Sequence, residues 1–263
     1  MKRAGGSKRL WIFDFDGTLS SLVPERSSAT LHPSCRKVLE ELAAGPRERV
    51  AILSNREIGD LIPRLPVPGI FLGGGSGLEW LLPGGLRVSP GRAAEARLAE
   101  RREELAPLFE SLRSVPGVDL EDKRWAVAVH TRRVPPEARG DLTARLERLR
   151  GHTGLRMFEG PESIEVQLMG PATKLHGIRW LCRRLKFDPP EGGIVYAGDD
   201  ESDAEAMEWV LSRKGIALVV GDRIEVPGAR TFEDPAGLAA AVRGIAGLPS
   251  PRQGKRERKA AAG

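Results

Sequence analysis

Two acidic residues follow a short apolar run near the start of the chain. The run Leu10–Phe13 contains aromatic and β-branched residues, a pattern typical of a strand buried on both faces. Asp14 and Asp16 come directly after it. Because side chains two positions apart on an extended chain point the same way, both can face one cleft at the carboxyl end of the strand. Two carboxylates this close repel each other unless a divalent cation lies between them or one is protonated. Either arrangement can support catalysis, whereas an Asx-type turn would explain only the step from Asp16 to Gly17.

These residue types suit phosphoryl transfer. That reaction needs a nucleophile in line with the leaving oxygen and cations that neutralise the equatorial phosphate oxygens. Asp14 is the candidate nucleophile, because a carboxylate can form an aspartyl-phosphate and so divide one difficult step into two. Asp16 is the candidate acid–base, which would protonate the leaving oxygen and then activate the hydrolytic water.

Two further polar residues lie at the ends of predicted elements. Ser54 ends the second predicted strand and can donate a hydrogen bond to a phosphate oxygen, although Ser-Asn is also a common way to start a helix. Lys174 begins a predicted helix, where the helix dipole disfavours a cation. A lysine in that place is better accommodated facing an anion. Taken alone, a solvated surface lysine would be the simpler explanation.

A third group of acids follows the apolar run 194–197. Asp199, Asp200 and Asp203 supply hard oxygen ligands of the kind that Mg²⁺ prefers, and Mg²⁺ needs only one or two protein carboxylates besides the phosphate. Asp199 is the first choice as ligand, with Asp200 and Asp203 as helpers. Helix capping would account for Ser202 and Asp203, but not for two acids at the strand end.

The elements that would position these side chains alternate along the chain. Short apolar runs predict strands and amphipathic runs predict helices, in the order β-α-β-α-β over the first third and again after residue 171. The expected strands lie at 9–13, 50–53, 69–72, 194–197, 216–220 and 230–232, and the expected helices at 31–44, 57–65, around 178–185, from about 200 and at 235–245. This order predicts an α/β fold with a doubly wound parallel sheet.

The middle third of the chain has a different pattern. It comprises a hairpin at 79–88, a charged helix at 91–114 broken or kinked at Pro107, strands at 118–123, 125–131, 155–159 and 163–168, and a helix through Leu142, Leu146 and Leu149. We expect it to form an α+β unit inserted into the first. The predicted organisation is a flexible amino end (1–8), a core in two parts (9–88 and 171–248), the inserted unit (89–170) and a basic disordered tail (249–263).

Composition excludes several classes of function. The net charge of +5 comes from the two chain ends, which each carry +4, and the rest of the chain carries −3, so the charge does not indicate a specific nucleic-acid partner. Cys35 and Cys182 lack metal-ligand spacing and are expected to be buried free thiols. The apolar run near the amino end is too short for a signal peptide or a membrane span. We therefore expect a cytoplasmic protein, a monomer or weak oligomer, with no membrane partner.

Four pieces of the sequence resemble, in order, the four motifs of the haloacid dehalogenase-like (HAD) phosphohydrolases. They are the stretch Asp14–Leu19, Ser54, Lys174 and the stretch Gly198–Asp200, and together they cover the core. The resemblance implies a HAD-like core, catalytic roles for the residues already named, and Mg²⁺ as cofactor. The metal-binding residues that it implies are Asp14, Asp16, Asp199, Asp200 and Asp203.

Within that superfamily the chain is most similar to trehalose-6-phosphate phosphatases. The motifs that carry this resemblance are Ser54-Asn55-Arg56, Gly74-Gly75-Ser76-Gly77-Leu78-Glu79, Glu121-Asp122-Lys123, His130-Thr131-Arg132, Glu165 and Gly198-Asp199-Asp200-Glu201-Ser202-Asp203. The resemblance implies that the inserted unit is a cap and that the substrate is a sugar phosphate, most directly trehalose 6-phosphate. The residues implied to bind it are Asn55, Arg56, Glu121, Lys123, Arg132 and Glu165.

The chain departs from the family pattern at four positions. Ser76 replaces a histidine, Asn55 a glycine, Leu175 the glycine after the motif lysine, and Leu168 a proline. These departures leave open a phosphatase for another sugar phosphate, such as a glucosylglycerol or glucosylglycerate phosphate. A weakly catalytic sugar-phosphate sensor is a further alternative, which the pair of Asp14 and Asp16 disfavours. Nucleic-acid binding would rest only on the basic chain ends.

Overall fold

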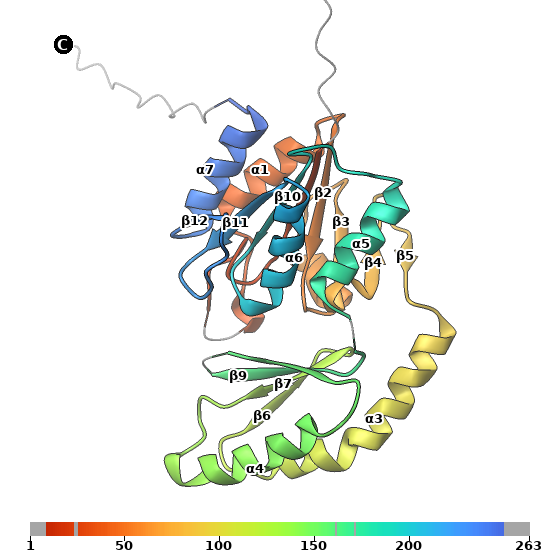
Figure 1. The fold of residues 1–263 in the computed structure, drawn as a ribbon, viewed down its shortest axis with the longest axis vertical. Coiled ribbons are helices and arrows are strands. Elements are labelled where there is room, and N and C mark those ends of the chain that lie inside the picture. The colour runs from red at the N-terminus through yellow and green to blue at the C-terminus, as the bar shows by residue number, and fades with distance from the viewer. Residues whose placement is uncertain (1–8, 24–25, 161, 171, 250–263) are drawn as a thin grey trace, which may run out of the picture.

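The computed structural model describes residues 9–23, 26–160, 162–170 and 172–249. In Figure 1 the chain forms a larger α/β unit, passes into a smaller unit below it and then returns. We call the larger unit the core (residues 9–88 and 172–249) and the smaller one the insertion (residues 89–170).

The core contains a sheet whose strands are mostly parallel. From one edge to the other its described strands are β12 (Arg230–Phe232), β11 (Ile216–Val220), β10 (Ile194–Gly198), β1 (Arg9–Phe13), β2 (Glu48–Leu53), β3 (Phe71–Gly74), β4 (Glu79–Leu81) and β5 (Arg87–Val88). Pairing is parallel from β12 to β3, and β4 and β5 continue the sheet as an antiparallel hairpin. The predicted doubly wound sheet is confirmed, and β1 lies at its centre between β10 and β2.

Helices cover both faces of this sheet. They are α1 (Pro33–Ala43), α2 (Ile58–Leu61), α5 (Lys174–Leu185), α6 (Glu201–Ser212) and α7 (Pro235–Ala246), with the short 3-10 segments η1 (Arg26–Ser28), η2 (Ile62–Arg64) and η3 (Gly75–Gly77). Residues of α1 and α7 belong to the apolar cluster on one face, and residues of α5 and α6 to the cluster on the other. Instead of the single helix predicted at 57–65, the structure has two short ones, α2 and η2. The reason is that Pro63 has no backbone N–H to donate an α-helical hydrogen bond.

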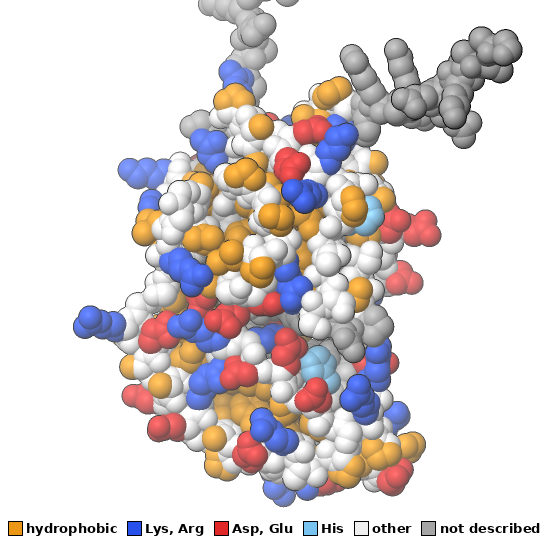
Figure 2. All heavy atoms as spheres, turned by 180° about the vertical axis from the view of Figure 1, so that it is seen from behind, with side chains coloured by type: hydrophobic (Ala, Val, Ile, Leu, Met, Phe, Trp, Pro, Cys, Tyr) orange, Lys and Arg blue, Asp and Glu red, His pale blue; other side chains and the backbone are white. Residues whose placement is uncertain are grey.

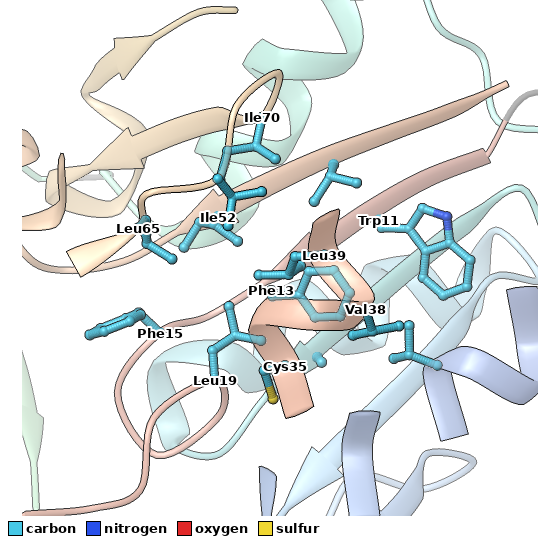
Figure 3. Packing of buried hydrophobic residues seen from close by; sticks show 14 of the residues in the cluster. Trp11, Phe13, Phe15, Leu19, Cys35, Val38, Leu39, Ile52, Leu65 and Ile70 are labelled. Carbon is cyan, nitrogen blue, oxygen red and sulfur yellow. The ribbon is translucent and has the colours of Figure 1, made fainter. Parts of the chain in front are cut away.

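Strand β1 sends alternate side chains to the two faces. Trp11 and Phe13 pack with residues of α1, as Figure 3 shows, whereas Leu10 and Ile12 pack on the side of α5 and α6. A strand covered on both sides must be apolar throughout, which explains the run that the sequence shows. By the same alternation Asp14 follows Ile12 onto the face covered by α5 and α6, so side chains of those helices can reach it.

The insertion has a sheet and an apolar core of its own. Its described antiparallel strands are, in order, β6 (Asp119–Asp122), β7 (Ala126–His130), β9 (Ser163–Gln167) and β8 (Arg156–Glu159), and its helices are α3 (Arg92–Arg113), η4 (Pro136–Ala138) and α4 (Arg139–Arg150). Val127, Val129 and Val166 pack on the face that the helices cover. The other face of this sheet is turned toward the core (Figure 1).

The sequence predicts a break or a kink at Pro107, and of these two outcomes the break is wrong. Helix α3 continues through it, with Leu98, Leu105 and Leu112 buried along its length. Pro107 lies on the exposed side, where water can hydrate the carbonyl of Glu103 that loses its intrahelical partner. Packing on both sides of the proline therefore holds the helix together.

The remaining fold-level predictions concern chain ends and thiols. The segments predicted to be flexible, 1–8 and 249–263, lie outside the described residues except for Pro249. Cys35 and Cys182 are buried free thiols, as predicted. Among the described residues, no helix combines the length and the apolar character that crossing a membrane requires.

Glycines allow α5 to approach η3 closely. A Cβ atom added to Gly177 would lie 2.8 Å from the carbonyl oxygen of Ser76, and one added to Gly77 would lie 2.4 Å from the Cα of Gly177. Both distances are shorter than ordinary contacts, so neither position has room for a side chain. Because Lys174 is the first residue of α5, this contact determines how near Lys174 comes to the strand ends.

We expect Gly177→Ala to lower the free energy of unfolding by about 1–3 kcal/mol, because the added methyl group must push α5 away from η3. Gly244→Ala in α7 is the matched control, since nothing lies within 4 Å of the added Cβ. It should raise the free energy of unfolding by up to about 1 kcal/mol through helix propensity. Urea denaturation of both variants makes the comparison, and stabilisation by both would show that the contact between α5 and η3 is not tight.

Candidate active site

Acidic residues from several elements surround one buried lysine at the carboxyl ends of β1 and β10. Asp14 follows β1, Asp199 follows β10, and Asp203 lies in the first turn of α6. The Nζ atom of Lys174 donates a hydrogen bond to Asp14 Oδ1 at 2.9 Å and to Asp203 Oδ1 at 2.6 Å. All four residues are buried. The structure thus brings together four of the site residues that the sequence indicated.

The Asp203 carboxylate is the most completely bonded member of this cluster. The hydroxyl of Tyr196 donates to Asp203 Oδ1 at 2.5 Å, next to Lys174. The backbone N–H groups of Asp199 and Asp200 donate to Asp203 Oδ2 at 3.1 and 3.3 Å. With both oxygens occupied, Asp203 holds the loop after β10 in place.

The carboxylate of Asp199 is oriented from two sides. Thr18 Oγ1 donates to Asp199 Oδ1 at 3.2 Å, and Arg223 Nη1 donates to Asp199 Oδ2 at 3.0 Å. The turn after β1 passes so close that a Cβ atom on Gly17 would lie 2.2 Å from Asp199 Oδ2, and the φ of Gly17 is +80°. Only glycine fits this position, for reasons of both space and backbone conformation.

Burial and mutual repulsion govern the protonation of the cluster. Burial raises the pKa of Asp14 well above its usual value, against the opposing effect of Lys174. Burial, reinforced by Asp200 and Asp203, raises the pKa of Asp199 to about 8. For Lys174, burial disfavours the charged ammonium, but the carboxylates of Asp14 and Asp203 outweigh it and raise the lysine pKa. The cluster therefore has more negative charge than its one lysine can balance.

This charge imbalance matches what a divalent cation would correct. One carboxylate oxygen each from Asp14, Asp199 and Asp203 lie within 4.8 Å of one another, and all three residues are buried. Carboxylate oxygens are the ligands that Mg²⁺ prefers. The donor set therefore fits Mg²⁺. Asp14 and Asp199 are the better donors, because each Asp203 oxygen already accepts two hydrogen bonds, whereas each Asp199 oxygen accepts one.

Asp16 and Asp200 lie outside that group of three, and each is held by neighbours. Both oxygens of Asp16 accept hydrogen bonds from Arg56, each at 2.7 Å. Asp200 is the N-cap of α6, and its Oδ1 accepts hydrogen bonds from the backbone N–H and the hydroxyl of Ser202. Burial opposes the charged form of Asp200, but Lys174 and the Ser202 hydrogen bonds outweigh it and lower the pKa.

Ser54 and Arg56 lie at the end of β2, next to the acidic cluster. Ser54 is buried, and its Oγ accepts a hydrogen bond from the backbone N–H of Arg56 at 3.1 Å, which leaves its hydroxyl proton available to an incoming ligand. Arg56 is itself buried, bonded to Asp16 and Asp60, and lies over the ring of Phe15. In this state Arg56 therefore positions Asp16.

The insertion presents charged and small side chains to the core. Glu121, Ala128 and Glu165 are register partners on neighbouring strands, so they form a row across the sheet with an alanine in the middle. Lys123 is buried and donates to Glu165 Oε2 at 2.6 Å, and His130 contacts Glu121 at 3.1 Å. Figure 2 shows acidic and basic side chains gathered along the seam between core and insertion. The small alanine leaves room between charged neighbours.

Two of the residues that the sequence implied for substrate binding have other surroundings. Arg132 is about half exposed and forms an ion pair with Glu162 on the loops beyond β7 and β8. Asn55 lies in the core, where its Nδ2 donates to Ser202 Oγ at 3.4 Å and its Oδ1 accepts from Ser76 Oγ at 2.6 Å. Asn55 therefore belongs to a polar network at the seam.

Three residues of the site were not singled out from the sequence. Thr18 was part of the first motif but had no separate role, and Tyr196 was counted only as a strand residue. A buried tyrosine hydroxyl requires a partner, and the chain has one tyrosine, so Tyr196 could have been noticed on that ground. Arg223 follows the carboxyl end of β11, where the same strand-end rule would have indicated it.

Comparison with known proteins gives relatives over most of the chain. A family model described as trehalose-phosphatase matches residues 12–231. A trehalose-phosphate phosphatase of Mycobacterium tuberculosis is 34% identical over 221 residues, which cover 81% of this chain and 55% of that protein. An uncharacterized glycosyl hydrolase of the same organism is 35% identical over 234 residues, covering 85% of this chain and 17% of that protein. The chain thus spans about half of the first relative and less of the second.

Solved structures share the fold. The C-terminal domain of Candida albicans trehalose-6-phosphate phosphatase superimposes with a TM-score of 0.74 at 20% identity, covering 92% of this chain and 93% of that one. Other structures with the same fold include haloacid dehalogenase-like hydrolases. The HAD-like fold class expected from the sequence is confirmed.

The charge imbalance predicts opposite effects on stability for two substitutions in the cluster. An Asp whose pKa is raised on folding destabilises the folded state increasingly as pH rises from its unfolded pKa toward its folded one, so Asp14→Asn should raise the unfolding temperature at pH 7.5 in EDTA. Lys174→Met removes the cation from between Asp14 and Asp203 and should cost about 3–5 kcal/mol. Thermal unfolding monitored by circular dichroism measures both, and a loss of stability in both variants would contradict the imbalance.

Proposed function

The chain belongs to the trehalose-phosphatase family, and from this premise we propose that it hydrolyses trehalose 6-phosphate to trehalose and inorganic phosphate. The observation that carries the proposal is the buried contact of Lys174 with Asp14 and Asp203, beside Asp199, at the centre of the sheet. A nucleophile, a balancing cation and metal-binding oxygens then lie where an α/β sheet normally binds its ligand.

In the first step Asp14 acts as the nucleophile. One carboxylate oxygen forms a bond to phosphorus while the bond between phosphorus and the sugar oxygen breaks, which gives an aspartyl-phosphate. Lys174 stabilises the negative charge as it shifts from carboxylate to phosphoryl oxygens, since its Nζ lies 2.9 Å from Asp14 Oδ1. The hydroxyl of Ser54 donates a hydrogen bond to a phosphoryl oxygen.

Asp16 transfers the protons. It gives a proton to the leaving sugar oxygen, then takes one from the water that attacks phosphorus, so that phosphate leaves and the free Asp14 carboxylate returns. Its side chain is 30% exposed and can be reached by substrate. Because both Asp16 oxygens accept hydrogen bonds from Arg56, the first proton transfer requires Arg56 to release at least one of them when substrate binds.

The acidic cluster is where we expect Mg²⁺ to bind. Asp14 and Asp199 would supply its protein ligands, with Asp203 holding the loop that carries Asp199. When bound, Mg²⁺ supplies positive charge beside the phosphoryl oxygens. Thr18 and Arg223 keep Asp199 oriented in the meantime.

The insertion acts as the cap in this proposal. Glu121, Lys123 and Glu165 lie on the face of its sheet turned toward the core and can hydrogen-bond sugar hydroxyls. Contacts with the sugar, far from phosphorus, would then use binding energy to close the cap and align the substrate with Asp14. Arg132, in its exposed ion pair with Glu162, would approach the sugar only after a change of partner.

A phosphate-release assay across sugar phosphates, with Mg²⁺ and with EDTA, tests the proposed function. We expect trehalose 6-phosphate to give the highest kcat/KM and EDTA to abolish turnover. A higher kcat/KM on glucosylglycerate phosphate would change the substrate and leave the phosphatase assignment intact. Asp14→Asn is the control for contaminating phosphatases and should lower kcat by on the order of 10³ or more. Release at the wild-type rate by this variant would exclude Asp14 as the nucleophile.

Removing the charge of Lys123 tests the cap. A hydrogen bond from a charged group is worth about 1.5–3 kcal/mol, so Lys123→Met should lower kcat/KM for trehalose 6-phosphate by about tenfold or more. The loss on p-nitrophenyl phosphate, which has no sugar to bind, should be much smaller. Lys214→Ala, which removes an exposed ion pair with Glu191 on the core, is the matched control. Equal losses on the two substrates would give Lys123 a structural role only.

A further inference from the structure

Strand β9 carries two buried oxygen atoms that accept no hydrogen bond. They are Glu165 Oε1 and Gln167 Oε1, and they are the buried side-chain polar atoms without a partner among the described residues. Both residues lie on the face of β9 turned toward the core, because Val166 between them packs on the helix-covered face. Gln167 is only 4% exposed. Unpaired buried acceptors cost free energy, so native structures keep few of them without a reason.

The two residues line the same small cavity at the seam between core and insertion. Its walls include Ser76 and Asn55 from the core and Trp125 from the insertion. The cavity measures about 10 Å³, which is enough for about one water molecule. A single water can donate two hydrogen bonds, one to each unpaired oxygen.

Hydrogen bonds on the core side fix the orientation of the Gln167 amide. Its Nε2 donates to Ser76 Oγ at 3.2 Å, and the Ser76 hydroxyl donates in turn to Asn55 Oδ1 at 2.6 Å. If the amide were reversed, its oxygen would face a hydroxyl whose proton is already used. The Nε2 atom therefore points to the core and Oε1 is the group offered to the cavity.

The backbone of Ser76 is held in an uncommon conformation at this point. Its φ is +59°, in the left-handed region, between two glycines that also have positive φ. Strain of this kind persists where the surroundings enforce it, often at ligand sites. Here it places Ser76 Oγ between Gln167 and Asn55, and Asn55 continues the network to Ser202 at the start of α6.

We propose that Gln167 is a specificity-determining residue, whose Oε1 accepts a hydrogen bond from a sugar hydroxyl next to the one accepted by Glu165 Oε1. The ligand is a pyranose ring with two adjacent hydroxyls, in the part of the substrate away from phosphorus. Because the cavity has room for about one water molecule, it must widen at the seam to admit them. The inference rests on the proposed sugar-phosphatase function and deepens it. Since the Gln167 amide also donates to Ser76 across the seam, the contact between insertion and core sets the direction in which Oε1 points.

The first test compares kcat/KM for trehalose 6-phosphate and p-nitrophenyl phosphate. Gln167→Met keeps the shape of the side chain and removes both hydrogen bonds, and Gln167→Asn keeps the amide but shortens its reach. For each variant the loss on trehalose 6-phosphate should exceed the loss on p-nitrophenyl phosphate by about tenfold. Ser163→Ala, on the same strand but away from the cavity, is the control. Equal losses on both substrates would overturn the proposal.

The second test identifies the hydroxyl. Among trehalose 6-phosphates that each lack one hydroxyl on the unphosphorylated ring, one should be a poor substrate for the wild type and lose nothing further in Gln167→Met. Losses that add for every analogue would contradict the contact. Calorimetry with trehalose, which needs no catalysis, should show weaker binding to Gln167→Met.

The two proposals fail in different ways. If wild-type protein does not hydrolyse trehalose 6-phosphate, the proposed substrate fails, and the same comparison is made with the best sugar phosphate of the panel. A selective loss by Gln167→Met on that substrate would support the inference, and a loss equal to that on p-nitrophenyl phosphate would overturn it.

Discussion

One buried ammonium group determines how the centre of this structure is arranged. Lys174 is almost completely buried and contacts the carboxylates of Asp14 and Asp203, which come from different parts of the chain. A buried charge is tolerated only beside opposite charge, so the start of α5 must lie near the ends of β1 and β10. The glycines at 77 and 177 make the close approach of α5 possible. The packing of α5 and the compensation of the Lys174 charge therefore depend on each other.

The charge of the same cluster is what supports the proposed binding of a cation and a phosphate ester. Three buried carboxylates lie around one lysine, so negative charge exceeds positive charge among these four groups. The neighbouring arginines do not balance this charge completely, because Arg56 is bonded to Asp16 and Asp60, while Arg223 donates to one oxygen of Asp199. Buried acids with raised pKa values lower the local stability of the folded state, as is common at active sites.

The insertion complements the core by the way its sheet is built. Its apolar face packs on α3 and α4, and its polar face carries Glu121, Lys123, Glu165 and Gln167 toward the core. The alanines of β7 have small side chains, so they leave space between the charged side chains of the neighbouring strands. The hydrogen bond from Gln167 to Ser76 joins the two units across the seam.

The sequence by itself determined the doubly wound parallel sheet and the polar residues at the ends of its strands. Apolar runs that end at Asp14, Ser54 and Asp199 are local signals. Neighbouring residues alone indicate that a strand is buried on both faces and where its carboxyl end lies. Contacts between distant residues were decided only by the tertiary structure. The bond of Arg56 to Asp16, that of Tyr196 to Asp203 and that of Gln167 to Ser76, 91 residues away, depend on which elements pack together. Sequence periodicity predicts the face on which a side chain lies, but not the residue that it contacts there. The continuity of α3 through Pro107 likewise depends on its packing against the rest of the insertion.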